Sequence, residues 1–243
     1  MVEREIRIET PDGSMRAFVT HPEGDGPFPL VVMLMDAPGY RDALKQALGR
    51  FASAGYFGVL PDMYHRAGDL DLSGADRDET MRLMSQISDD MSLSYVRAVI
   101  EFADSEDAAR TPAGCVGYCW GGRLVVRAMA AFSDVFAVGA SIHPARVVTD
   151  QPNSPHQDIA KIRGEIYFGC GEQDGFTPPE VIDTLQRTLD GAGVRGEIEI
   201  YPGAEHGFAV AGNRAYLADA SERHFERTLE VFRRNLSGSA VPA

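Results

Sequence analysis

Gly114-Cys-Val-Gly-Tyr-Cys-Trp-Gly-Gly122 is the most informative segment of this chain. Its first half, Gly114–Tyr118, is a short apolar run of the kind that forms a strand buried on both faces. After it, Leu124–Phe132 has the apolar content of a helix that packs on a sheet. The glycines between the two runs mark a sharp turn. The segment therefore predicts a strand, a turn at Cys119 and a helix, which is the basic unit of an α/β fold.

Cys119 lies in this turn, between Gly117 and Gly121. A nucleophile at a strand–turn–helix junction has a strained backbone and close neighbours, and Gly117, Gly121 and Gly122 avoid the clash that a Cβ atom would cause. The following helix directs unpaired N–H groups and the positive end of its dipole at the sulfur, which favours the thiolate. We therefore expect Cys119 to be a nucleophile. The alternative is a small buried side chain in a glycine-rich loop.

A nucleophile at such a turn needs an acid and a base, which follow it in the chain in the order acid, histidine. The acid is expected after the next-to-last strand, Glu165–Cys170, where Asp174 lies in a glycine-rich turn. Glu172 is the alternative acid, although a solvated loop carboxylate is the simpler interpretation of it. The histidine is expected after the last strand, where His206 lies in a second glycine-containing turn. The sequence thus predicts that Cys119, His206 and Asp174 act together.

The rest of the chain alternates short apolar runs with helical patterns, which is typical of a mainly parallel sheet covered by helices. The first two runs, Glu5–Glu9 and Met15–Thr20, alternate with a period of two and predict an antiparallel hairpin. Further strands are predicted at Leu30–Met35, Phe57–Leu60, Phe136–Ile142, Glu165–Cys170 and Glu197–Tyr201. Helical spacing is present at 44–51, 181–189 and 225–236, and as one long or broken helix at 78–104. We expect a single α/β domain over residues 1–243, with a mainly parallel central sheet, an antiparallel N-terminal hairpin and helices on both faces.

The composition narrows the classes of partner. The 243 residues include 23 Lys and Arg against 36 Asp and Glu, a formal net charge of −13. This charge argues against nucleic acid and anionic membrane surfaces, since both are bound through basic residues. The three cysteines are too few for a disulfide scaffold, the first residues lack the pattern of a signal peptide, and no apolar run is long enough to span a bilayer. We expect a cytoplasmic protein with a small-molecule substrate and with neither a nucleic-acid nor a membrane partner.

The remaining histidines and cysteines carry weaker signals. His143 follows a strand at the same sheet edge as the other candidates and is a candidate pocket residue, and His65 could also line the cleft. Cys115 and Cys170 lie in strands and are interpreted as core thiols. Because none of these residues has the spacing of metal ligands, we predict no metal site and no cofactor. Three further histidines in polar contexts are interpreted as structural: His21, His156 and His224.

Three motifs together resemble the dienelactone hydrolase (carboxymethylenebutenolidase) family, a branch of the α/β-hydrolase fold. They are Gly117-Tyr-Cys-Trp-Gly-Gly122, Gly171-Glu-Gln-Asp174 and Glu205-His-Gly-Phe208, and Pro61-Asp-Met-Tyr64 fits the family's pattern after an earlier strand. The resemblance spans nearly the whole chain. It implies a hydrolase that attacks a lactone or ester carbonyl with Cys119, moves the proton with His206 and orients the imidazole with Asp174.

The resemblance also implies groups around this triad. The oxyanion hole is expected to use the backbone N–H groups of Trp120 and of Ala37, which comes after the Leu30–Met35 strand. Asp36 stands where the family has a glutamate that contacts the resting thiol and helps to activate it when substrate binds. Asp36 is one methylene shorter than this glutamate, and its alternative role is that of a turn or N-cap carboxylate.

One departure from the family bears on the substrate. Family members that act on dienelactone hold its carboxylate with arginines, one of them shortly after the catalytic histidine, whereas Gly207-Phe-Ala-Val210 has no arginine here. Arg77 or Arg82 could replace the other arginine. We therefore expect a less charged lactone or ester as substrate. The residues expected to bind this substrate or to gate its access are Asp36, Tyr64, Arg77, His143 and Phe208.

Two other functions remain open on the sequence alone. A non-catalytic ligand-binding protein could use the same scaffold, although such proteins usually lose a triad member. A thiol redox enzyme could use Cys115 and Cys119, although three residues lie between them rather than the two of a C-x-x-C motif. The sequence also leaves the oligomeric state open, with a monomer as the simplest expectation.

Overall fold

A computed structural model describes residues 1–70, 72 and 76–236. The chain forms two compact units, Met1–Thr111 and Pro112–Ala243, and each is described by itself. The boundary between the units falls within strand β5 (Ala109–Tyr118). The expectation of one domain over residues 1–243 stays a prediction.

The first unit has the strand order β1-β2-β4-β3. Its strands are β1 (Val2–Thr10), β2 (Gly13–His21), β3 (Phe28–Leu34) and β4 (Phe57–Pro61). β1 and β2 form the predicted antiparallel hairpin, with Ile6 opposite Ala17. β4 is antiparallel to β2 and parallel to β3, where Val32 pairs with Val59. The change from alternating to continuous apolar sequence thus marks the change from the hairpin to the parallel strands.

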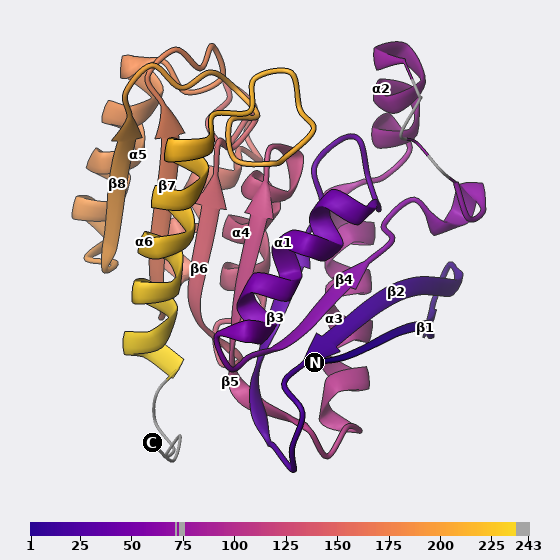
Figure 1. Ribbon diagram of the computed structural model, residues 1–243. Coiled ribbons are helices and arrows are strands. Elements are labelled where there is room, and N and C mark those ends of the chain that lie inside the picture. Colours follow the sequence, from indigo (N-terminus) through magenta and orange to yellow (C-terminus); the bar gives the residue numbers. More distant parts are fainter. Residues whose placement is uncertain (71, 73–75, 237–243) are drawn as a thin grey trace. The chain divides into compact units, whose positions relative to one another are not determined.

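Helices α1 (Asp42–Ser53), α2 (Arg77–Ser85) and α3 (Asp89–Asp104) accompany these strands, with a short 3₁₀ helix, η1 (His65–Ala67), after β4. In Figure 1, α1 lies in front of the strands and α3 behind them. α1 buries the predicted apolar face, which includes Leu44, Leu48 and Phe51. The helix predicted at 78–104 is broken, because the Ser88 side chain accepts the Met91 N–H at 3.1 Å and caps α3.

The second unit has the strand order β5-β6-β7-β8, and its neighbouring strands are parallel in the pairs β5–β6, β6–β7 and β7–β8. After β5 come β6 (Phe136–Ile142), β7 (Glu165–Gly171) and β8 (Gly196–Tyr201). Ala140 of β6 pairs with Val116 of β5 on one side and with Tyr167 of β7 on the other. The second half of β5, together with β6 and β7, is almost fully buried, as the continuous apolar runs predict.

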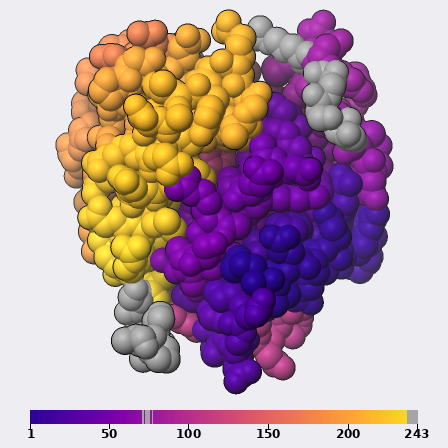
Figure 2. All heavy atoms as spheres, in the orientation of Figure 1, coloured from indigo at the N-terminus to yellow at the C-terminus, as the bar shows by residue number. Residues whose placement is uncertain are grey.

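Helices α4 (Trp120–Ala131), α5 (Pro179–Ala192) and α6 (Ala218–Leu236), with a 3₁₀ helix, η2 (Pro155–Lys161), cover these strands. Within the second unit, α6 lies in front of the strands and α4 and α5 lie behind them (Figure 1). α6 contacts β6 and β7 and buries Val231 and Phe232, while its outer side forms the yellow surface in Figure 2. Helices therefore cover both faces of these strands.

Parallel strands place the residues that follow them at one edge of a sheet. In the second unit, β5, β7 and β8 end at Tyr118, Gly171 and Tyr201, and the three predicted catalytic residues follow these ends within a few positions. The architecture is the predicted α/β fold, with mainly parallel strands and an antiparallel N-terminal hairpin. In the part of the chain that the structure describes, no helix has the length and apolar character needed to cross a membrane.

Candidate active site

The turn after β5 has the backbone strain expected for a nucleophile. Cys119 has φ 53° and ψ −114°, which is uncommon for a residue with a Cβ atom, and α4 begins at the next residue. A Cβ atom at Gly117 would lie 2.2 Å from the Gly121 carbonyl oxygen, and one at Gly122 would lie 3.1 Å from the Ile142 carbonyl oxygen. Close backbone contacts therefore require these glycines. Cys119 itself is partly exposed, at the N-terminus of α4.

Asp174 and His206 meet across the turns that follow β7 and β8. His206 Nδ1 donates to Asp174 Oδ2 at 2.8 Å, and Asp174 Oδ1 accepts the backbone N–H of Phe176 at 2.8 Å. The Asp174 side chain is fully buried, while that of His206 is 24% exposed. Glu172 is exposed and accepts the Gly203 N–H at 2.7 Å. The carboxylate beside the imidazole is therefore that of Asp174.

The turns that carry this acid and this base are tied to each other. The N–H of Gln173 donates to the Ala204 carbonyl at 2.9 Å, and the N–H of Glu172 donates to the carbonyl at the end of β8 at 3.0 Å. A Cβ atom at Gly171 would lie 2.5 Å from the Ala204 oxygen, so glycine is required where the turns approach. The backbone thus holds the acid and the base at a fixed separation.

The His206 imidazole interacts with a carboxylate and a thiol. Burial alone would lower the pKa of His206, but the hydrogen bond to Asp174 and the electrostatic influence of Cys119 and Asp174 outweigh burial and raise this pKa to about 10. The Phe176 ring packs on the imidazole with 4.6 Å between ring centroids. Asp174 and His206 are therefore directly bonded, and Cys119 is near enough to influence the imidazole electrostatically.

His143 and Phe208, two of the expected substrate residues, are fully buried. Their ring centroids are 5.4 Å apart, and the centroid of the His143 ring lies 5.0 Å from that of His206. Phe208 also packs on Tyr201, with 4.8 Å between centroids. Both side chains therefore pack in the interior of the second unit, with His143 directly against the His206 imidazole.

The other expected residues belong to the first unit. Asp36 is 1% exposed and forms a two-point ion pair with Arg41, in which Arg41 Nη2 lies 2.8 Å from Asp36 Oδ2. The Asp36 carbonyl accepts the Gly39 N–H at 2.9 Å, which closes a turn. The Ala37 carbonyl accepts the Tyr64 hydroxyl at 2.9 Å. The Asp36 charge is therefore matched by a guanidinium of the same unit, and its backbone, not its carboxylate, closes the turn.

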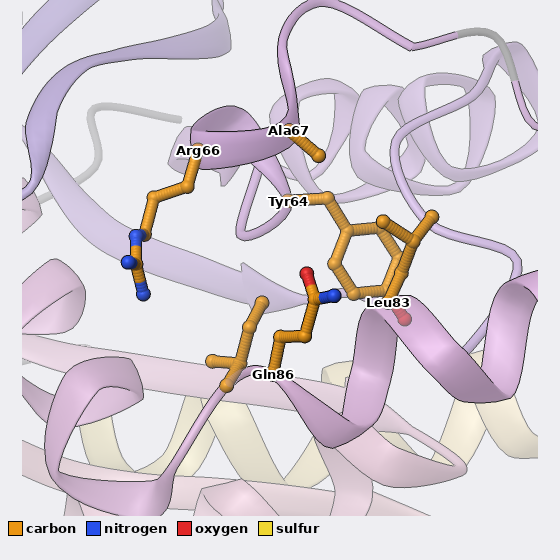
Figure 3. Close-up of a pocket in the computed structure, with 6 residues that line it drawn as sticks. Tyr64, Arg66, Ala67, Leu83 and Gln86 are labelled. Carbon is orange, nitrogen blue, oxygen red and sulfur yellow. The ribbon is translucent and has the colours of Figure 1, made fainter.

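A pocket of about 380 Å³ lies beside Tyr64 in the first unit. Its lining consists of Tyr64, Arg66, Ala67, Leu83, Gln86 and Ile87. Arg66 supplies a cation and Gln86 an amide; in Figure 3, Gln86 lies beside the Tyr64 ring and Arg66 lies across the pocket from it. Arg77 is the first residue of α2, and its side chain lies outside the described part of the chain.

Cys115 and Cys170 are buried free thiols. Burial raises the pKa of Cys115 strongly and that of Cys170 to about 12, so both thiols stay protonated and unreactive. Both therefore have the properties predicted for core thiols. Within the described ranges, no group of three or more His, Cys, Asp or Glu side chains is arranged to hold a metal ion.

Reasoning from the sequence missed three residues that contact or surround candidate residues within one unit or the other. Arg41 carries no motif signal other than its place five residues after Asp36. Phe176, which packs on the His206 imidazole, had a usable signal, because it comes two residues after the predicted acid. His224 is fully buried in α6, between the polar Arg223 and the buried Phe225. Val231, seven residues later, lies on the same helix face and is also buried, so this spacing would have indicated the burial.

The chain is similar to known proteins along nearly its whole length. Residues 15–236 match the family described as "Dienelactone hydrolase family". A protein from Methylorubrum extorquens named "Putative carboxymethylenebutenolidase" is 26% identical over 238 residues, which cover 96% of this chain and 81% of that protein. "Hydrolase tropI" from Talaromyces stipitatus is also 26% identical, over 83% of this chain and 80% of that protein.

The same fold occurs in a solved structure. The crystal structure of a "Putative Dienelactone Hydrolase" from Klebsiella pneumoniae superposes with a TM-score of 0.88 and 23% identity, and the match covers 96% of this chain and 98% of that one. The family match, the relatives and the fold agree. The chain belongs to the dienelactone hydrolase family, and it is a hydrolase of the lactone and ester class.

Proposed function

We propose that this enzyme hydrolyses a small lactone or carboxylic ester through a thioester on Cys119, with His206 and Asp174 completing a Cys–His–Asp triad. The observation that carries the proposal is the contact of His206 Nδ1 with Asp174 Oδ2 at 2.8 Å, beside a cysteine in a strained turn at the start of α4. Interactions of the imidazole with Asp174 and Cys119 outweigh its burial and raise the pKa of His206 to about 10. A protonated imidazole beside a sulfur stabilises the thiolate, which is the nucleophilic form. The dipole of α4, which begins at Trp120, acts in the same direction.

In the first half of the reaction, Cys119 Sγ attacks the carbonyl carbon and forms the C–S bond of a thioester. The ester C–O bond breaks, and His206 donates its proton to the leaving alkoxide. With a lactone, the leaving hydroxyl group stays attached to the acyl chain. Asp174 stabilises the imidazole in the orientation that this transfer requires.

In the second half, a water molecule attacks the thioester and gives a proton to His206. The C–S bond then breaks, which releases the carboxylic acid and returns the thiolate of Cys119 and the protonated imidazole. One ester bond and one water molecule are consumed, and one acid and one hydroxyl group are formed. No further reactant is needed.

The negative charge that develops on the carbonyl oxygen requires hydrogen-bond donors. We assign one donor to the backbone N–H of Trp120, at the first position of α4 and directly after the nucleophile. Ala37 is the proposed second donor. The Tyr64 hydroxyl donates to the Ala37 carbonyl at 2.9 Å, which favours a fixed orientation of this segment within the first unit.

The proposed substrate carries no carboxylate. Phe208, Ala209 and Val210, after the catalytic histidine, are 0%, 3% and 2% exposed, and this apolar stretch offers no cation where relatives that act on dienelactone are expected to hold a carboxylate. A panel of small lactones and esters, each with and without an acidic substituent, tests this choice. Faster turnover of the acidic members would contradict it.

Hydrolysis of p-nitrophenyl acetate by cysteine variants tests the mechanism. Cys119→Ala is expected to lower kcat by at least about 1000-fold. Cys115→Ala and Cys170→Ala are the matched controls, which keep most of the activity because both thiols are buried and protonated. Mass spectrometry of the quenched reaction is expected to find one acetyl group, on Cys119. Full activity in Cys119→Ala would overturn the proposal.

Two observations weigh against the other functions. The Asp174–His206 hydrogen bond supports catalysis over ligand binding alone, because a binding protein has no use for an oriented base. A redox enzyme would need Cys115 to react with oxidised Cys119, and burial raises the pKa of Cys115 far above its ordinary value. A Cys115–Cys119 disulfide formed under mild peroxide, or tight ligand binding without turnover, would contradict the hydrolase proposal.

A further inference from the structure

His143, the residue after β6, has an unusual backbone conformation. Its φ is 37°, in the region that residues with bulky side chains rarely adopt. Its N–H donates to the Gly169 carbonyl of β7 at 2.7 Å, and its side chain is completely buried. Such a conformation persists only where the surrounding contacts hold it. The contacts of the ring therefore indicate what the conformation achieves.

The His143 ring binds the backbone of the candidate nucleophile. The N–H of Cys119 lies 3.1 Å from His143 Nδ1, to which it donates, and 3.0 Å from the carbonyl oxygen of Ile142. The Cys119 carbonyl accepts the N–H of Ala145 at 3.0 Å. The segment 142–145 thus binds both polar backbone groups of Cys119. Because the Cys119 N–H is already bonded, the next N–H along the chain is the better candidate for the oxyanion hole.

The acceptor role of Nδ1 also determines where the ring carries its proton. An imidazole nitrogen that accepts a hydrogen bond has no proton, so the proton of neutral His143 lies on Nε2. Burial, together with the neighbouring His206 and His224 imidazoles, lowers the pKa of His143 well below its ordinary value. The rings of His143 and His206 meet edge to face, with an angle of 73° between their planes. His206 therefore carries the charge, and His143 stays neutral.

We propose that His143 is a positioning residue, whose Nδ1 holds the N–H of Cys119 and thereby keeps the turn in the conformation that directs Sγ toward His206. This inference rests on the proposed function, in which Cys119 is the nucleophile. The carbonyl of Ile142 would accept the same N–H whatever residue stands at 143. The Nδ1 contact is the part that a substitution can remove, and without it the strained Cys119 backbone is free to relax.

Three substitutions at position 143 distinguish the role of Nδ1 from that of Nε2. Asparagine carries Oδ1 on Cγ, as histidine carries Nδ1, and it tolerates a positive φ, so His143→Asn keeps an acceptor for the Cys119 N–H. His143→Gln moves the amide outward to the region of Nε2, and His143→Leu removes both polar groups. His156→Asn is the matched control, because His156 lies in η2 and its Nδ1 contacts Ser154 Oγ at 2.7 Å instead.

Two rates are measured on each full-length variant. One is turnover of p-nitrophenyl acetate, separated into kcat and KM, and the other is alkylation of Cys119 Sγ by iodoacetamide, which forms a C–S bond and releases iodide. Loss of one hydrogen bond is expected to lower kcat and the alkylation rate about tenfold in His143→Leu and His143→Gln, with KM changed less than about twofold. His143→Asn and the control His156→Asn are expected to stay within about threefold of the unchanged protein.

The order of the variants distinguishes positioning from simple packing. If His143 only filled space, all three of its variants would melt at lower temperature. Their alkylation rates would then not depend on whether the side chain offers an acceptor to the Cys119 N–H. An unchanged alkylation rate in His143→Gln would overturn the inference. A His143→Asn protein as slow as His143→Gln would also overturn it, because the role would then belong to Nε2. These two variants decide the matter if His143→Leu does not fold.

Failure of this inference is distinguishable from failure of the proposed function. Full hydrolytic activity in Cys119→Ala contradicts the triad, whatever the His143 variants do. Loss of activity in Cys119→Ala together with unchanged rates in His143→Gln contradicts only the positioning role.

Discussion

Two buried aspartates, one in each unit, have partners of different chemistry. Asp36 pairs with the guanidinium of Arg41, and Asp174 pairs with the imidazole of His206. Both residues are nearly inaccessible, at 1% and 3% exposure. An arginine keeps its charge at every pH that the protein meets, so the first pair is permanent. An imidazole gains and loses a proton, so the second pair can take part in proton transfer.

Burial alone therefore does not distinguish the two carboxylates. What differs is whether the partner titrates, and whether a third group such as Cys119 lies beyond it. The Asp36 pair is therefore expected to act mainly on stability and the Asp174 pair mainly on rate. Variants of the two pairs test this separation directly.

The largest expected effect is kinetic and belongs to Asp174. Asparagine has the same shape but no charge, so it neither fixes the imidazole tautomer nor stabilises the imidazolium, and Asp174→Asn is expected to lower kcat about 10³–10⁴-fold. Glu172→Gln is the control within the same turn, and kcat is expected to change less than about twofold because this carboxylate is exposed. Steady-state kinetics measures both. Equal losses in the two variants would show that the wrong acid has been assigned.

A large effect on stability is expected for the pair of Asp36 and Arg41. Arg41→Leu leaves the Asp36 carboxylate buried without its cation, which is expected to lower the free energy of unfolding by about 3 kcal/mol. Urea denaturation measures this change. The accompanying loss of kcat is expected to be far smaller than in Asp174→Asn. An unchanged denaturation midpoint would mean that Asp36 finds another partner.

The pH dependence of stability separates the pairs a second time. The pKa of His206 is about 10 in the folded protein, above the ordinary value of about 6.5 in an unfolded chain. Stabilisation from the charged imidazole is therefore complete below about pH 6.5 and is lost as the pH rises through about 10.

The stabilisation from the charged imidazole is measured as the unfolding free energy of the unchanged protein minus that of His206→Gln. The value is expected to shrink between about pH 7 and pH 10, while the same difference for Arg41→Leu stays constant because arginine does not titrate there. A pH-independent value for His206→Gln would contradict the raised pKa of His206. In NMR titrations, Asp174→Asn is expected to bring the His206 pKa down, since the bond to Asp174 raises it.

The smallest effect is expected where both partners are exposed. Arg163 and Asp134 form an ion pair with side chains 72% and 81% exposed, and Arg163→Ala is expected to change the free energy of unfolding by less than about 0.5 kcal/mol. The same urea series measures it. A change as large as that in Arg41→Leu would contradict the expectation that a buried ion pair contributes more to the free energy of unfolding than an exposed one.

The strand–turn–helix unit and the positions of the strands along the chain could be predicted because their signals are local. The alternating runs marked the hairpin, and the continuous runs marked the parallel strands. Gly117 and Gly122 are required because backbone atoms of the turn and of the adjacent strand leave no room for a Cβ atom. Periodicity alone left the helix at 78–104 open, and the Ser88 cap divides it. A capping serine followed by two aspartates was the readable sign of this break.

Which groups contact each other in the folded chain could not be predicted in the same way. That Asp36 takes Arg41 depends on how the turn after β3 folds back, and that His143 accepts the Cys119 N–H depends on a positive φ after β6. His224 shows the same limit, because its burial is decided by the strands that α6 covers. These features arise from tertiary contacts, which the pattern of residue types along one element does not record.

The shared backbone hydrogen bonds between the turns after β7 and β8 have an evolutionary consequence. Because the N–H of Gln173 is bonded to the carbonyl of Ala204, a shift of either turn carries the other with it. Selection for a new substrate can therefore reshape distant loops while the spacing between carboxylate and imidazole is inherited intact. A scaffold built in this way can diversify what it cleaves without reinventing how it cleaves.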